Sequence, residues 1–106
     1  MIQVTYYRSY HRLTVTGHAG AAEPGHDLIC ASASMLAYTL AVNVGNMADN
    51  KQVREPILDM REGDTVISCK PLHKFKSTVT LIFDTVCAGF ELLAYQHPEN
   101  ISYEIR

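Results

Sequence analysis

Apolar and polar residues alternate near the start of the chain, and this period-two pattern predicts β-strands. Residues 2–8 place apolar side chains at every second position, and a second such run covers about residues 13–17. The two runs are separated by Ser9-Tyr10-His11. A short turn segment between two alternating runs is typical of a hairpin, so these residues are predicted to form a strand pair.

The same alternation returns in the second half of the chain. Residues 53–60 and 64–70 flank the charged turn Arg61-Glu62-Gly63-Asp64, which predicts a second strand pair. A last alternating run at residues 101–105 predicts a fifth strand. The pattern therefore predicts two strand pairs and one strand that is separate from them in sequence.

Two longer segments between these strands have helical character. Asp27 is a good N-cap for a helix that runs to about Asp49, and this start places Cys30 at the third helical position. Small residues along this helix permit close packing against a sheet or a partner helix: Ala31, Ala33, Ala37, Ala41 and Gly45. A second helix ends at His97-Pro98 and carries one apolar stripe: Phe75, Val79, Ile82, Phe83, Val86, Phe90 and Leu93.

The element order β-β-α-β-β-α-β predicts an α+β sandwich with the helices packed on one mixed sheet. A length of 106 residues fits one domain, residues 1–106. The hydrophobic share of 47% and the charged share of 19% are ordinary for a globular domain. A net charge of -2 gives no basic footprint, so direct nucleic-acid binding is not expected.

Cysteine spacing bears on cofactors and compartment. Cys30, Cys69 and Cys87 form no C-x-x-C pair and no zinc-binding spacing, so we expect no metal or other cofactor. Cys69 in a strand and Cys87 on the apolar stripe are expected in the core. Met1 leads directly into an alternating pattern without a cleavable apolar region. We therefore expect a cytoplasmic protein, and a reducing compartment suits a free thiol.

One stretch raises the question of a membrane span. No charged side chain occurs from Leu28 to Ala48, a length that would nearly cross a bilayer core as a helix. The stretch also contains serine, threonine, asparagine and glycine, and it lacks basic residues at its ends. A buried helix is therefore predicted rather than a membrane span.

The segment from Gly17 to Leu36 contains a histidine and a cysteine that could act together. His18 ends the second strand, and Cys30 lies in the first turn of the helix, where unpaired N–H groups and the macrodipole favour a thiolate. An imidazole that takes the thiol proton would make the pair a nucleophile and its base. Cysteine is also common as a small buried apolar residue, so the sequence leaves that role open.

Other polar residues have candidate roles near this pair. His26 is a rival base closer to Cys30 in sequence, but only nine residues join the second strand to the helix, which places His18 and the helix start at one sheet edge. Asp27 either caps the helix or orients the His18 imidazole. Ser34 lies one turn after Cys30 and either hydrogen-bonds near the thiol or packs. The remaining histidines are interpreted as ordinary surface or turn residues: His11, His73 and His97.

Three motifs in this segment resemble the ribosomal-processing cysteine protease family: Gly17-His18-Ala19, Gly25-x-Asp27 and Asp27-x-x-Cys30-Ala31-x-x-Ser34. Members of that family remove a short N-terminal extension from large-subunit ribosomal protein twenty-seven during ribosome assembly. The resemblance implies a Cys-His endopeptidase with His18 and Cys30 as catalytic residues and with Asp27 and Ser34 beside them. It also implies a ribosomal protein precursor as partner, with apolar and aromatic residues in its extension, and a homodimer.

The loop from Gly20 to Gly25 is either a plain connection or a lid. Its two glycines flank Glu23-Pro24 and suit hinges, so we expect the loop to order over a bound peptide. The alternative to the protease is a non-catalytic ribosome-assembly binding module in which the cysteine is incidental. Selective alkylation of Cys30 would distinguish the two.

Overall fold

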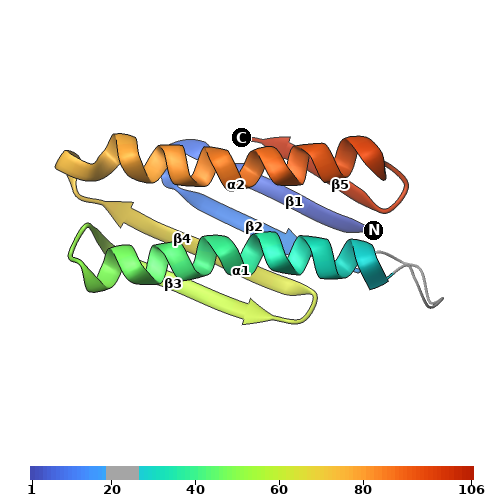
Figure 1. The fold of residues 1–106 in the computed structure, drawn as a ribbon, viewed down its shortest axis with the longest axis horizontal. Coiled ribbons are helices and arrows are strands. Elements are labelled where there is room, and N and C mark those ends of the chain that lie inside the picture. The colour runs from blue at the N-terminus through green and yellow to red at the C-terminus, as the bar shows by residue number, and fades with distance from the viewer. Residues whose placement is uncertain (19–26) are drawn as a thin grey trace.

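Two long helices lie side by side over one face of a five-stranded sheet (Figure 1). The structure, a computed structural model, describes residues 1–18 and 27–106. Within this part of the chain, the order of elements confirms the predicted α+β arrangement. The elements are β1 (Ile2–Tyr7), η1 (Arg8–Tyr10), β2 (Arg12–Thr16), α1 (Asp27–Asp49), β3 (Val53–Arg61), β4 (Asp64–Pro71), η2 (His73–Phe75), α2 (Lys76–Gln96) and β5 (Ile101–Ile105).

The sheet has the strand order β3-β4-β2-β1-β5, which places the two predicted strand pairs beside each other. β1 pairs antiparallel with β2 and parallel with β5, so the sheet is mixed as predicted. The register sets Tyr6 of β1 opposite Leu13 of β2, and Leu13 opposite Ile67 of β4. Opposed side chains point to the same face of a sheet, so these residues form an apolar row beneath the helices.

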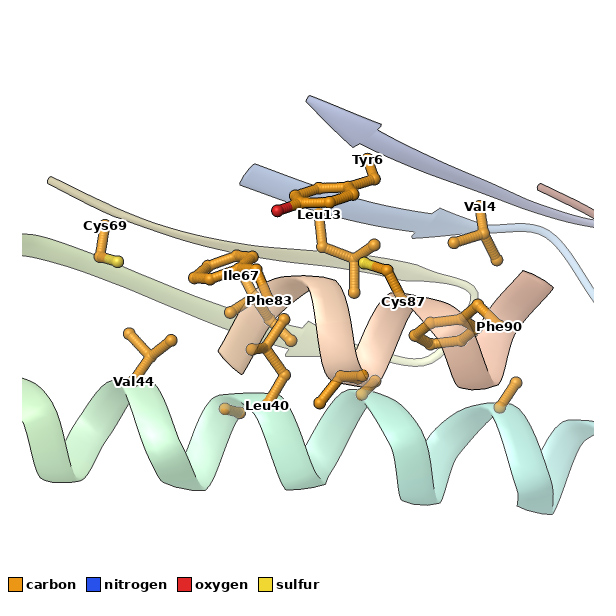
Figure 2. Close-up of a cluster of buried hydrophobic side chains, with 14 of the residues drawn as sticks. Val4, Tyr6, Leu13, Leu40, Val44, Ile67, Cys69, Phe83, Cys87 and Phe90 are labelled. Carbon is orange, nitrogen blue, oxygen red and sulfur yellow. The ribbon is translucent and has the colours of Figure 1, made fainter. Parts of the chain in front are cut away.

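The hydrophobic core lies between the sheet and both helices. Leu40 of α1 and Phe83 and Phe90 of α2 are fully buried, and Figure 2 shows them with Val4 and Ile67 of the strands. Burial of each such side chain contributes about 1.5–3 kcal/mol. The predicted stripe of the second helix is confirmed, since its members are either buried or packed against the core: Phe75, Val79, Ile82, Phe83, Val86, Phe90 and Leu93.

Small residues let α1 approach its neighbours closely. A Cβ built on Gly89 of α2 would lie 2.7 Å from Leu36 Cδ2, so a larger residue at position 89 would force Leu36 to move. Ala31, by contrast, is exposed. Three of the small residues of α1 are buried in the core: Ala33, Ala37 and Ala41.

Two helical segments, Leu28–Asp49 and His73–Gln96, are long and apolar enough to cross a membrane by length and composition alone. Core helices of globular domains pass the same test. Here each helix buries one side against the sheet, with Leu40 and Phe83 at 0% exposure. The segment from Leu28 is a helix, as predicted, and it contributes Leu40 to the core, whereas the absence of a membrane span stays a prediction.

His11 corrects one sequence-based interpretation. It does lie in the turn between β1 and β2, but it is only 4% exposed and is not an ordinary surface residue. Its backbone adopts the left-handed conformation with φ 49°. Its Nε2 atom lies 2.7 Å from the Thr80 hydroxyl, and its ring meets the Phe83 ring edge-on at 5.8 Å. The packing of α2 over the turn buries this histidine.

A small polar network stands beside His11. The Tyr6 hydroxyl donates to Asp84 Oδ1 at 2.8 Å, and Arg8 donates to both carboxylate oxygens of Asp84 at 3.0 Å. The hydrogen bond from Arg8 is the main reason that the pKa of Asp84 lies below its usual value. These contacts connect α2 to the C-terminal end of β1.

Candidate active site

A cleft of about 610 Å³ forms where three segments meet: the first half of α1, the end of β2, and the turn between β3 and β4. His18 and Cys30 both line this cleft, although twelve positions separate them in sequence. Strand β1 contributes Ile2 to the lining. The other lining residues are Val15, Gly17, Ala33, Ser34, Ala37, Tyr38, Met60, Arg61, Glu62, Gly63 and Thr65.

Cys30 differs from the other two thiols in its surroundings. It is free, half-buried and within the first turn of α1, where it packs against the core and still reaches the cleft. Cys69 and Cys87 are free but are buried in the core, as predicted. Burial raises the pKa of Cys69 to about 11 and that of Cys87 to about 12. Cys30 is therefore the thiol that solvent and a peptide can reach.

His18 is held at the cleft by two glycines. Gly17 has φ +87°, and a Cβ at this position would collide with the carbonyl oxygen of Met1, so glycine alone fits here. The Gly17 N–H donates to the Gly63 carbonyl oxygen at 2.9 Å. The exposed His18 imidazole then lies against Gly63 itself. The end of β2 and the β3–β4 turn thus act together to place the imidazole.

Ser34 and Tyr38 extend the wall of α1 beyond Cys30. They follow Cys30 by one and two helical turns on the same face, and both are exposed to the cleft. The Ser34 hydroxyl has no hydrogen bond to another residue of the described ranges 1–18 and 27–106. Its two sequence-based roles, hydrogen bonding near the thiol or packing, stay predictions.

The β3–β4 turn is the part of the cleft that sequence reasoning missed. Residues 61–64 were expected to form a turn, and they do, but their place beside His18 was not foreseen. The register that sets Thr16 opposite Asp64 brings the turn to the end of β2. The sequence contains only a weak signal for this position of the turn, because the position follows from the pairing of β2 with β4.

Several sequence-based interpretations lie outside the described residues. Gly20 and Gly25, the hinges of the proposed lid, and His26, the rival base, belong to this group. The contacts of the Asp27 side chain also lie outside it, so its capping and orienting roles stay predictions. Among the residues that the structure describes, no group of three or more His, Cys, Asp or Glu side chains could hold a metal ion.

A free thiol near a helix N-terminus, sharing a cleft with a histidine, is the arrangement of cysteine hydrolases. The family model described as cysteine protease Prp matches residues 1–102, and the chain belongs to this family. No curated protein matches the chain in sequence. The expected family is thereby confirmed.

Solved structures share the fold. An essential ribosomal processing protease Prp from S. aureus, in complex with a covalently linked product peptide, aligns with a TM-score of 0.70 at 21% identity, covering 99% of this chain and 97% of that chain. The same S. aureus protease with a substrate peptide gives 0.63 at 18% identity over 99% and 97% of the two chains. SMU.848 from Streptococcus mutans gives 0.64 at 28% identity over 99% and 93%.

Proposed function

We propose that this protein is an endopeptidase that removes the N-terminal extension of large-subunit ribosomal protein twenty-seven during ribosome assembly. Membership of the cysteine protease Prp family supports the reaction class. The structurally similar S. aureus protein is a ribosomal processing protease that was solved with a substrate peptide, which supports a ribosomal precursor as substrate. The observation that carries the proposal is the shared cleft of Cys30 and His18.

The proposed mechanism uses these two residues in sequence. His18 takes the thiol proton, and the Cys30 thiolate attacks the scissile carbonyl carbon. The tetrahedral oxyanion accepts hydrogen bonds from N–H groups at the start of α1, including that of Cys30. When the intermediate collapses, the C–N bond breaks, and the imidazolium gives its proton to the leaving amine. Water activated by His18 then hydrolyses the thioester, which releases the acid and restores the thiol.

The lining of the cleft supports a peptide with apolar side chains. Apolar and small residues make up part of its lining, and the β3–β4 turn adds the charged residues Arg61 and Glu62. Arg61 is engaged in ion pairs with Asp59 and Asp64. Apolar side chains thus share the lining with polar groups, and they can contact the apolar side chains of a bound peptide. The apolar lining residues are Ile2, Val15, Ala33, Ala37 and Met60.

The setting of this activity is also part of the proposal. We infer a cytoplasmic homodimer that binds a ribosomal protein precursor without direct contact to nucleic acid or membrane. The net charge of -2 supports the first exclusion, and the packing of both helices on the sheet supports the second. The lack of a charged residue between Leu28 and Ala48 supports a second copy of the chain as the partner of α1.

The test is intact-mass analysis of the extended precursor after incubation with the protein. Wild type is expected to shorten the precursor by one N-terminal segment, and Cys30→Ala is expected to leave it intact. Trapping a thioester at Cys30 by rapid acid quench would support the acyl-enzyme. Binding of the precursor by wild type without any cleavage would contradict the proposal and favour a binding module.

A further inference from the structure

The imidazole of His18 occupies the space that a side chain at Gly63 would need. A Cβ built on Gly63 would lie 2.8 Å from His18 Nε2 and 3.0 Å from Cε1, closer than side-chain atoms normally approach. Gly63 has φ +72°, a conformation that L-residues rarely adopt. The turn could therefore require glycine for its backbone alone, but the imidazole sets a second requirement on the same side of the Cα atom.

The turn that carries Gly63 is fixed in place by contacts on both sides. Its carbonyl oxygen accepts a hydrogen bond from the Gly17 N–H at 2.9 Å, one residue before His18. Arg61 bridges Asp59 at 3.1 Å and Asp64 at 3.2 Å, which ties the two strand ends of the hairpin together. The surface that His18 meets is thus held relative to the backbone that carries His18.

We propose that Gly63 is a positioning residue for the general base: its missing side chain leaves room for the His18 imidazole in the cleft that Cys30 also lines. This inference rests on the proposed protease function. Gly63 itself transfers no proton. A misplacement of a catalytic group by about 1 Å can cost about 100-fold in rate. Displacement of the imidazole by an added Cβ is therefore expected to affect the chemical step rather than peptide binding.

Two substitutions show whether glycine is needed at position 63 to leave room for the imidazole or to avoid backbone strain. Gly63→Ala and Gly63→Asn add the same Cβ, but asparagine tolerates a positive φ better than alanine. Both variants are expected to lower kcat for precursor cleavage by about 10- to 100-fold, with KM changed by less than about twofold. The loss is expected in both even though their melting temperatures differ. Full kcat in Gly63→Asn, with a loss in Gly63→Ala alone, would assign the effect to strain and overturn the proposal.

A second readout does not depend on cleavage. NMR of ring-labelled histidine reports the His18 imidazole directly, and its ring resonances are expected to change in both Gly63 variants. Gly45→Ala is the matched control, since a Cβ there meets only Leu58 Cδ1 at an ordinary 3.7 Å. Unchanged His18 resonances in a folded Gly63→Asn variant would overturn the proposal that Gly63 positions the imidazole. If wild type fails to cut the precursor, the proposed function is wrong. The His18 resonances still decide in that case whether Gly63 positions the imidazole.

Discussion

At the scale of single residues, the three thiols of this chain have very different environments. Cys69 and Cys87 are at most 2% exposed, and burial raises their pKa to about 11 and about 12. The thiolate is the reactive form, and at pH 7 it amounts to about one part in ten thousand or less at such pKa values. Cys30 alone lines the cleft.

A small alkylating reagent at pH 7 is therefore expected to label Cys30 and to leave Cys69 and Cys87 unmodified over the same period. Peptide mapping by mass spectrometry after timed quenching measures this selectivity. The unfolded chain in denaturant serves as the control, and all three cysteines are expected to react there. Equal labelling of Cys30 and Cys69 in the folded protein would contradict the assignment of Cys30 as the accessible thiol.

His11 gives the stability of the protein a pH dependence. Burial is the main cause that lowers its pKa, with further contributions from Lys76 and Arg8, whereas Asp84 acts in the opposite direction. The unfolded chain, with an ordinary histidine pKa of about 6.5, binds a proton at pH values where the folded chain does not. The free energy of unfolding contributed by neutral His11 is thus fully present above that pH and is lost as the pH falls below it.

We expect urea denaturation of wild type to give a free energy of unfolding that decreases from pH 7 to pH 5. His11→Asn, which tolerates the left-handed backbone, is expected to show a flatter dependence. The lowered pKa of Asp84 acts in a separate window, because its contribution is lost only below its usual value of 3.8. Parallel curves for wild type and variant would assign the pH dependence to other groups.

At the scale of elements, α1 has two apolar faces, one buried and one exposed. One face packs on the sheet, and its cleft end carries Cys30. On the other face, Leu28, Met35 and Val42 recur every seven residues and are 70%, 67% and 60% exposed. Seven residues make nearly two helical turns, so these side chains form one stripe. An exposed apolar stripe of this kind marks an interaction surface, and a second copy of the chain is the proposed partner.

Met35→Glu is expected to convert the proposed homodimer to a monomer, because a carboxylate at the centre of the stripe would have to be desolvated in the interface. Sedimentation velocity at matched concentrations measures the change. Tyr95→Glu is the control, since Tyr95 is 84% exposed on α2 and lies outside the stripe. If the Met35→Glu variant sediments as wild type does, the stripe is not the dimer interface.

At the scale of the whole molecule, the sequence was most informative where structure depends on local pattern. The first helix was predicted from Asp27 to about Asp49 and occupies those residues, because the type of residue at its start and the composition of the segment are local signals. The strand pairs were likewise predicted from alternation. The sequence motif also placed His18 and Cys30 together, and both line one cleft.

Features that depend on distant pairing could not be obtained in this way. The β3–β4 turn reaches His18 only because β2 pairs with β4, and local periodicity carries no information on strand partners. His11 was interpreted as an ordinary surface or turn residue because it is, like His73 and His97, dispersed along the chain away from the candidate site. Its burial comes from Thr80 and Phe83 of α2, which are remote in sequence.

The parallel pairing of β1 with β5 has a consequence for how the chain folds. It sets Ile2 opposite Ile101, so the first strand acquires one of its two neighbours only when nearly the whole chain is available. Contacts of such high sequence separation slow folding, because loop-closure entropy is lost before the pairing is gained. During synthesis on the ribosome, one edge of β1 therefore stays without its native partner until β5 emerges, and in this interval that edge is exposed to aggregation.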